Sequence, residues 1–109
     1  MNNTFFITGT DTGIGKTFVT CILMQFIKFH HKKVIGMKPI AAGVDIKKGE
    51  TANEDVNLLQ YESSLKLKVG EINTYSFDEP IAPHIAAQKN SIEIDFKKIK
   101  MHAATLKSR

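Results

Sequence analysis

A glycine-rich loop near the start of the chain constrains its fold more than any other stretch. Residues 9–17 read Gly-Thr-Asp-Thr-Gly-Ile-Gly-Lys-Thr, between the apolar run at 5–7 and a long apolar-periodic segment. A G-x-G-K-T sequence between a strand and a helix typically binds phosphate, because its glycines let backbone amides turn toward an anion. The first glycine lies one residue earlier than in G-x-x-x-x-G-K-[ST], and a tight turn with an exposed lysine is the alternative. We predict a phosphate-binding loop in which Lys16 reaches the β- and γ-phosphates and the Thr17 hydroxyl ligates Mg²⁺.

The composition indicates a soluble globular protein of one small domain, residues 1–109. Of these residues 42% are hydrophobic and 24% are charged, and the formal net charge is +4, which argues against global disorder. The lysines form scattered pairs rather than a stripe with aromatic residues, so nucleic acid is not an expected partner. The single cysteine, Cys21, excludes an internal disulfide. With no signal peptide and no apolar run near the roughly 18 residues of a membrane span, we expect a cytoplasmic protein without a membrane partner.

The first 40 residues predict a strand, a helix and a second strand. Residues 4–8 are β-branched and aromatic, as in a strand buried on both faces, and residues 34–38 form a second such run before Pro39. Between them, residues 16–31 carry an amphipathic stripe, and we expect this helix to be largely covered. The stripe comprises Val19, Ile22, Leu23, Phe26 and Ile27. Because parallel strands end at one edge of a sheet, Lys16 and Lys38 are predicted to face a common crevice.

The remaining residues predict a loop at 41–50, a helix from a capping box at Thr51 to about residue 62, a strand at 72–77 and a helix at 91–106. The first of these helices, which ends near residue 62, is expected to bury Val56 and either Leu58 or Leu59. Asp55, in its first turn, either complements the helix dipole or faces the phosphates as a metal ligand. The run at 72–77 is too polar for a central parallel strand, and His84 after it is either an acid–base group or a packing residue.

These elements together predict an α/β fold, a P-loop NTPase-like parallel sheet with flanking helices. The last predicted helix is not followed by another strand. Asp78 and Glu79 follow the run at 72–77 as a Walker B carboxylate would, but that run is too polar for a central strand, so no strong candidate completes a Mg²⁺ site. We therefore expect the sheet to be incomplete at the C-terminus and the chain to be the N-terminal part of a single larger P-loop domain.

Four sequence elements resemble those of the dethiobiotin synthetase family, ATP-dependent carboxylases of the biotin pathway. They are the loop at 9–17, Lys-Pro-Ile-Ala-Ala-Gly at 38–43, Asn-Glu-Asp at 53–55 and Glu-Pro-Ile-Ala-Pro-His at 79–84. They occur in the family's order and cover most of the chain, so the resemblance is to the N-terminal portion of that family. A single phosphate-binding loop would not distinguish it from other P-loop proteins.

The resemblance implies a ligase that makes dethiobiotin, ADP and phosphate from 7,8-diaminononanoate, CO₂ or bicarbonate, and ATP. It also implies that the enzyme uses Mg²⁺ as cofactor and is a homodimer. One amine forms a carbamate, ATP phosphorylates it, and the second amine closes the ureido ring. The motif match makes Lys38 the catalytic residue and Thr17 and Asp55 the metal ligands. The implied nucleotide-binding residues are Thr12, Gly13, Ile14, Gly15, Lys16, Thr17, Phe18 and Asp55. The implied substrate-binding residues are Thr12, Lys38 and Ala42.

Two departures from the family pattern bear on activity. Ala42 stands where the family has a hydroxyl residue that contacts substrate, and the family's third metal ligand belongs to a strand beyond residue 109. We therefore expect these residues alone to lack full activity. The alternatives are a non-catalytic fragment that binds phosphate weakly, and a partitioning-type P-loop ATPase. The latter class usually carries a signature lysine at the position of Asp11, which disfavours it.

Overall fold

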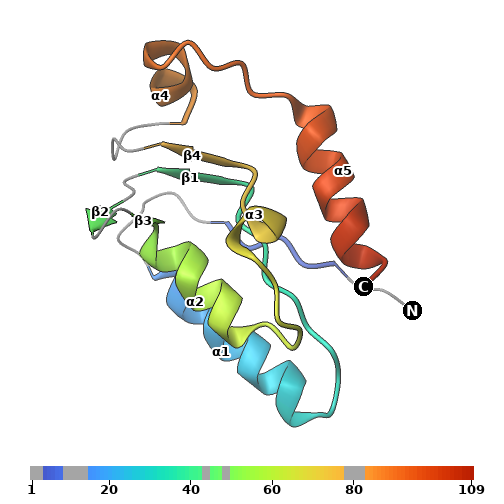
Figure 1. The fold of residues 1–109 in the computed structure, drawn as a ribbon. Coiled ribbons are helices and arrows are strands. Elements are labelled where there is room, and N and C mark those ends of the chain that lie inside the picture. The colour runs from blue at the N-terminus through green and yellow to red at the C-terminus, as the bar shows by residue number, and fades with distance from the viewer. Residues whose placement is uncertain (1–3, 9–14, 43–44, 48–49, 78–82) are drawn as a thin grey trace.

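The computed structural model describes residues 4–8, 15–42, 45–47, 50–77 and 83–109. Figure 1 shows two helices side by side on one side of a short sheet and a long helix near the C-terminus. Within the described residues, no helix has the length and apolarity that a membrane span requires. The elements in chain order are α1 (Lys16–Phe29), β1 (Ile40–Ala42), β2 (Asp45–Lys47), β3 (Glu50–Ala52), α2 (Glu54–Glu62), α3 (Val69–Ile72), β4 (Tyr75–Phe77), α4 (Pro83–Lys89) and α5 (Phe96–Lys107).

The sheet at the centre of the fold is a parallel pair of short strands, β1 and β4 (Figure 1). Ile40 lies opposite Tyr75, and Ala42 lies opposite Phe77. Ala41 and Phe77 are buried, and α4 packs against both strands. A parallel sheet with flanking helices confirms the predicted α/β class.

The strand predicted over 72–77 is present in shortened form. Ile72 ends α3, and only Tyr75–Phe77 forms a strand, which among the described strands pairs with β1 alone. Asn73 and Thr74, whose polarity argued against a central strand, lie before it in the connection. Within β4 the exposed Ser76 precedes the buried Phe77, so the alternation of strand faces turns the polar side chain outward.

The predicted loop at 41–50 is wrong, because this region contains three short strands. After β1, strands β2 and β3 form an antiparallel pair in which Asp45 lies opposite Ala52 and Lys47 lies opposite Glu50. The antiparallel pair satisfies backbone groups locally, which a loop of this length would leave to solvent.

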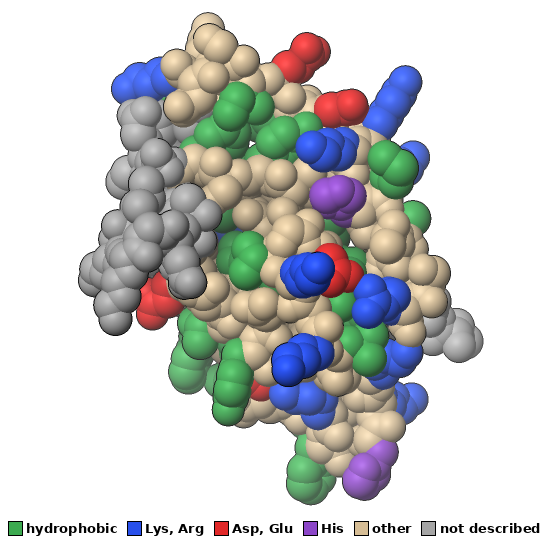
Figure 2. Space-filling model, viewed as in Figure 1, with side chains coloured by type: hydrophobic (Ala, Val, Ile, Leu, Met, Phe, Trp, Pro, Cys, Tyr) green, Lys and Arg blue, Asp and Glu red, His purple; other side chains and the backbone are tan. Residues whose placement is uncertain are grey.

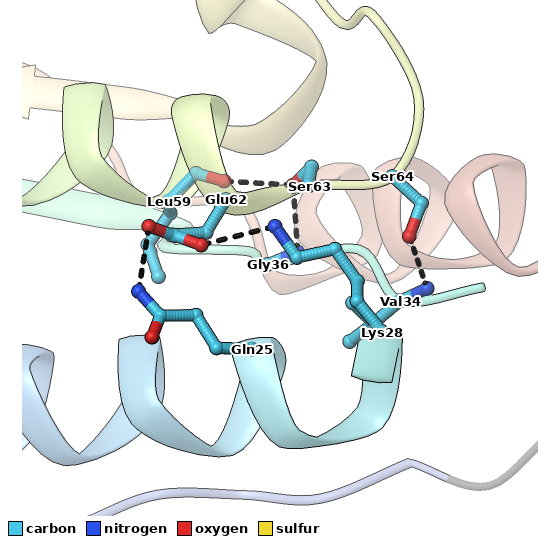
Figure 3. A network of polar contacts seen from close by, with 8 residues as sticks. All are labelled: Gln25, Lys28, Val34, Gly36, Leu59, Glu62, Ser63 and Ser64. Carbon is cyan, nitrogen blue, oxygen red and sulfur yellow. Dashed lines mark hydrogen bonds and ion pairs between the residues drawn. The ribbon is translucent and has the colours of Figure 1, made fainter. Parts of the chain in front are cut away.

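The strands predicted at 4–8 and 34–38 are not formed in the structure. Residues 4–8 are exposed, with Phe6 at 89%, and no described strand pairs with them. Residues 34–38 have other backbone partners: the N–H of Val34 donates to the Ser64 hydroxyl at 2.9 Å and that of Gly36 to the Ser63 hydroxyl at 3.0 Å (Figure 3). Apolar β-branched runs predict strands only where a neighbouring strand completes the ladder.

Helix α1 begins where the sequence predicts and ends at Phe29, but its predicted burial is wrong. Val19, Ile22 and Phe26 of the apolar stripe are at least half exposed, and Met24 is the buried residue of the helix. Figure 2 shows apolar side chains reaching the surface in several places, with lysine and arginine side chains spread between them. The stripe has the period of an amphipathic helix, but period alone does not fix which face is covered.

The main core includes residues of α1, β1, α2, α3 and α5, and the segment at 34–38 packs against it. It contains seven buried residues: Met24, Ala41, Val56, Leu59, Leu67, Ile72 and Leu106. Gly36 is buried among them, and a Cβ at this position would lie 3.0 Å from Leu59 Cδ2 and 3.0 Å from Met24 Cε. The absence of a side chain at Gly36 therefore lets the extended segment pass close to both helices.

Helix α2 begins at Glu54 and not at the predicted capping box. Asn53 is the N-cap, and its Oδ1 accepts a hydrogen bond from the Val56 N–H at 3.2 Å. An asparagine side chain caps as well as a threonine one, so the cap at Thr51 is two residues too early. The predicted burial of Val56 and Leu59 is confirmed, whereas Leu58 is 41% exposed.

The C-terminal helix is shorter than predicted. Helix α5 begins at Phe96, because Asp95 caps it by accepting a hydrogen bond from the Lys97 N–H at 2.9 Å. Leu106 is its buried residue and packs in the main core. His84, which lies in α4, is exposed; no described contact assigns it an acid–base role.

Candidate functional site

The N-terminal end of α1 supplies the first part of the candidate site. Gly15 caps the helix with a φ of 82°, a left-handed conformation that glycine adopts readily. Lys16 and Thr17 are the first residues of the helix, at the positive end of its dipole. Phe18 follows with an exposed ring. The predicted phosphate contacts at 12–14 lie outside the described residues.

The first turn of α2 supplies a carboxylate. Asp55 is the second residue of the helix, and its Oδ2 forms an ion pair with the Nζ of Lys38. The hydroxyl of Thr17 donates a hydrogen bond to the same carboxylate. Side chains from α1, from α2 and from the segment before β1 therefore meet at one point, which we call the α1–α2 site.

Opposing effects act on the pKa of Asp55. Burial raises it, but the hydrogen bond and charge of Lys38, the hydrogen bond from Thr17 and the charge of Lys16 outweigh burial and hold the pKa below its usual range. The carboxylate is therefore ionised at neutral pH. The charges of both predicted lysines, Lys16 and Lys38, therefore act on this carboxylate.

Helices α1 and α2 run in the same direction. Thr17 and Asp55 meet at the beginnings of the two helices, and Lys28 and Glu62 meet at their ends, with Lys28 Nζ 3.0 Å from Glu62 Oε2. The positive ends of both dipoles therefore lie at the α1–α2 site. Two adjacent positive helix ends and two lysines make this a favourable place for a polyanion such as a triphosphate.

A second polar cluster joins the opposite ends of the same helices (Figure 3). Glu62 accepts hydrogen bonds from Lys28 at 3.0 Å and from Gln25 at 3.1 Å. These two hydrogen bonds lower the pKa of Glu62 in spite of its burial. The cluster fixes α2 against α1, and thereby fixes the relative positions of Thr17 and Asp55 at the other end.

The location of Lys38 differs from the prediction. It precedes β1 by two residues and does not end a strand. Its backbone N–H donates to the Ile72 carbonyl at 2.9 Å, and its carbonyl accepts from the Asn73 side chain at 2.9 Å. Ala42 is the last residue of β1, and the side chain of Ala42 lies outside the described part of the chain. Sequence reasoning did not single out Asn73; its only signal was a polar side chain just before a strand.

A comparison with models of protein families assigns the chain to a family. A family model described as an AAA domain matches residues 3–107. The chain belongs to this AAA domain family. The phosphate-binding loop predicted from the sequence agrees with that membership, because an AAA domain is a P-loop nucleotide-binding domain.

Curated relatives of this AAA domain carry a more specific name. The chain is 43% identical over its full length to a protein of Nitrosospira multiformis named ATP-dependent dethiobiotin synthetase BioD, and covers 46% of that protein. Over 96% of its length it is 40% identical to a protein of the same name from Aromatoleum aromaticum, of which it covers 47%. The resemblance to dethiobiotin synthetases is thus confirmed, and the chain spans less than half the length of these relatives.

Proposed function

We propose that this chain provides the nucleotide-binding and catalytic-lysine part of a dethiobiotin synthetase. The complete reaction joins 7,8-diaminononanoate and CO₂ or bicarbonate with cleavage of ATP to ADP and phosphate. The observation that carries the proposal is the ion pair of Lys38 with Asp55, whose carboxylate also bonds to Thr17 and whose pKa the charge of Lys16 lowers. The names of the relatives support the choice of reaction.

Nucleotide binding follows from the charge arrangement. The positive ends of α1 and α2 and the ammonium of Lys16 attract the β- and γ-phosphates, and Gly15 allows the chain to turn into the helix. We assign the nucleotide contacts to the loop residues Thr12, Gly13, Ile14 and Gly15, to the first helix residues Lys16, Thr17 and Phe18, and to Asp55.

The oxygen donors at the site fit Mg²⁺. Thr17 supplies a hydroxyl and Asp55 an ionised carboxylate, already in contact with each other and with a cation, the Lys38 ammonium. Mg²⁺ in nucleotide enzymes is held by one or two carboxylates and by the substrate phosphates, so a larger acidic cluster is not required. We propose that Thr17 and Asp55 hold the ion, which would neutralise charge on the transferring phosphoryl group.

Lys38 is the proposed catalytic residue. An amine nitrogen of the diamine attacks CO₂ and loses a proton to form a carbamate, and a carbamate oxygen then attacks the γ-phosphorus, giving a carbamic-phosphoric anhydride and ADP. The second amine attacks the carbonyl carbon and gives up a proton, the carbon–oxygen bond to the phosphate breaks, and phosphate leaves as the ureido ring closes. Each intermediate before ring closure is an anion, so a fixed ammonium at this point stabilises the charge that develops.

The substrate contacts and the assembly are also proposals. We assign diamine and carbamate contacts to Thr12, Lys38 and Ala42, the last through its backbone because alanine lacks a hydroxyl. We further propose that residues 1–109 are part of a single P-loop domain, that the protein acts as a homodimer in the cytoplasm, and that neither nucleic acid nor membrane is a partner.

The test combines calorimetric titration with a phosphate-release assay. The chain is titrated with Mg-ATP and with the diamine, and phosphate release is measured with bicarbonate, with and without diamine. Diamine-dependent release supports the proposal, whereas release that is indifferent to the diamine supports an ATPase of another kind. Weak nucleotide binding without turnover supports a non-catalytic fragment.

A further inference from the structure

Lys38 is held by its backbone from both sides. Its N–H donates to the Ile72 carbonyl at 2.9 Å. Its carbonyl accepts from Asn73 Nδ2 at 2.9 Å, and the same nitrogen donates to the Tyr75 carbonyl at 2.8 Å and to the Pro39 carbonyl at 3.4 Å. One side-chain amide therefore connects the residue that carries the ammonium to the beginning of β4.

The chemistry of an amide suits this position. Its nitrogen carries two hydrogens, which match the two short bonds to Lys38 and Tyr75, and the longer contact with Pro39 shares one of them. Pro39 has no N–H, so the backbone there cannot donate to a neighbouring strand. The Pro39 carbonyl instead accepts from the N–H groups of Thr74 and Tyr75, at 2.9 and 2.8 Å. The turn at 72–75 thus grips residues 38 and 39, with Asn73 at its centre.

The backbone hydrogen bonds of Lys38 limit where its side-chain ammonium can lie. Fixing the Lys38 carbonyl and N–H fixes the direction of its Cα–Cβ bond, which leaves the four-carbon side chain to reach Asp55. Without the hydrogen bonds to the turn at 72–75, the backbone that carries the Lys38 side chain would be less fixed, because in the described chain this segment belongs to no strand until β1 begins at Ile40.

We propose that Asn73 is a positioning residue that holds Lys38 so that its ammonium faces Asp55 and Thr17. The benefit to catalysis rests on the proposed function, but the placement of the ammonium does not. Asn73 does not touch the reacting atoms in this proposal and acts only through Lys38.

The chain contains an internal control for this proposal. Lys28 and Lys38 each pair with a carboxylate of α2, and their side chains are similarly exposed, at 34% and 30%. Among the described residues, Lys28 forms no hydrogen bond or ion pair with residues 72–75, and its pair with Glu62 lies at the opposite end of α2. A general loosening of the fold would affect both lysines, whereas loss of the grip would affect Lys38 alone.

The experiment is competitive reductive methylation at trace reagent, with the rate at each lysine read by peptide mass spectrometry. We compare the wild-type chain with Asn73→Ala and with the isosteric Asn73→Asp, which turns an oxygen toward three carbonyls. We expect the methylation rate of Lys38 relative to Lys28 to rise about three- to ten-fold, as loss of one or two hydrogen bonds implies. An unchanged ratio in both variants would overturn the proposal.

A matched variant tests specificity. Gln60→Ala removes another side-chain amide that grips a carbonyl, that of Leu67, at 2.7 Å. This variant should leave the Lys38-to-Lys28 ratio at its wild-type value, and an equal rise in Gln60→Ala would also overturn the proposal. If Asn73→Ala does not fold, Asn73→Ser, which keeps one donor, is measured the same way with a smaller rise expected.

The labelling needs neither nucleotide nor turnover, so it separates the two proposals. A raised ratio in a protein without diamine-dependent phosphate release would keep the positioning role and reject the proposed function. Where release is observed, Asn73→Ala should lower kcat and leave the KM for ATP within about two-fold, because Lys38 acts on the transferring group and not on nucleotide binding.

Discussion

Two lysine–carboxylate pairs lie at opposite ends of α2, one formed with α1 and the other with the segment before β1, and they differ in what surrounds them. Lys28 and Glu62 lie at the C-terminal ends of α1 and α2, where Gln25 also donates to the carboxylate, whose side chain is 10% exposed. Asp55 lies at the N-terminal end of α2, where Lys38 reaches it from the segment before β1, and the Asp55 side chain is 39% exposed. The first pair is enclosed, whereas the second remains open to solvent and to a ligand.

The dipoles of the helices sharpen this difference. A carboxylate at a helix C-terminus is unfavourable, so Glu62 depends on Lys28 and Gln25 for its charge to be compensated. Asp55 is favoured by its position in the first turn of α2 and has a second donor in Thr17. Each carboxylate keeps one other donor if its ammonium leaves, but only Asp55 also keeps a favourable helix position, so Asp55 is the better placed to exchange the ammonium for another cation. The enclosed pair stabilises the helix packing, and the open pair is suited to binding.

The largest expected effect is on turnover. Lys38→Ala should lower diamine-dependent phosphate release at least about 100-fold, as removal of a group that stabilises developing charge does, while the dissociation constant for Mg-ATP changes less than about three-fold. Lys28→Ala is the matched control and should retain turnover. A large loss of ATP binding in Lys38→Ala would contradict the role given to Lys38.

The enclosed pair should dominate stability. Glu62→Ala is expected to lower the free energy of unfolding by about 2 kcal/mol, because hydrogen bonds to a charged group are lost from a buried position. Asp55→Ala should cost less than about 1 kcal/mol, since the Asp55 side chain is 39% exposed and its ion pair is screened by solvent. Urea denaturation measures both values, and a larger loss in Asp55→Ala would reverse the comparison.

Acid should weaken both pairs, in the same direction. The pKa of Glu62 lies below the ordinary 4.5 and that of Asp55 below the ordinary 3.8. Each carboxylate therefore contributes stability that is fully present above these values and is lost as the pH falls through the lower pKa of the folded state. Glu62→Gln should flatten this acid-induced decline in urea midpoints. An unchanged decline would show that other groups cause it.

The smallest expected effect is that of salt concentration on the relative reactivity of Lys38 and Lys28. Raising the salt concentration from about 0.05 to 0.5 M should increase the methylation rate of Lys38 relative to Lys28 by less than about two-fold, because exposed charges are screened more than enclosed ones. The rates are read by the same peptide mass spectrometry. A fall in the ratio would mean that the enclosed pair is the weaker one.

The parts of the fold that short-range signals determine were predictable from the sequence. Lys16 and Thr17 begin a helix because the glycine loop ends there, and Val56 and Leu59 are buried because they share a helix face. Asp55 lies in the first turn of α2 under either interpretation of its role. Its contact with Thr17 favours the interpretation in which it faces the phosphates, and metal binding remains a prediction.

The parts that depend on distant partners were not predictable in the same way. Residues 34–38 have the composition of a strand, but their N–H groups bond to Ser63 and Ser64, which are remote in sequence. The buried face of α1 depends on where α2 packs, which its own period does not report. Asn73 reaches Lys38 across 35 positions, and no local pattern marks such a bond.

Gly36 lies where α1 and α2 both pack closely against the extended segment that leads to Lys38. It lies where the extended segment runs between Met24 of α1 and Leu59 of α2, two positions before Lys38, and a Cβ there would lie 3.0 Å from the end of each side chain. A larger residue at position 36 would therefore require Met24 and Leu59 to shift. The spacing of the two helices at this point thus limits the size of the residue that leads the chain to Lys38.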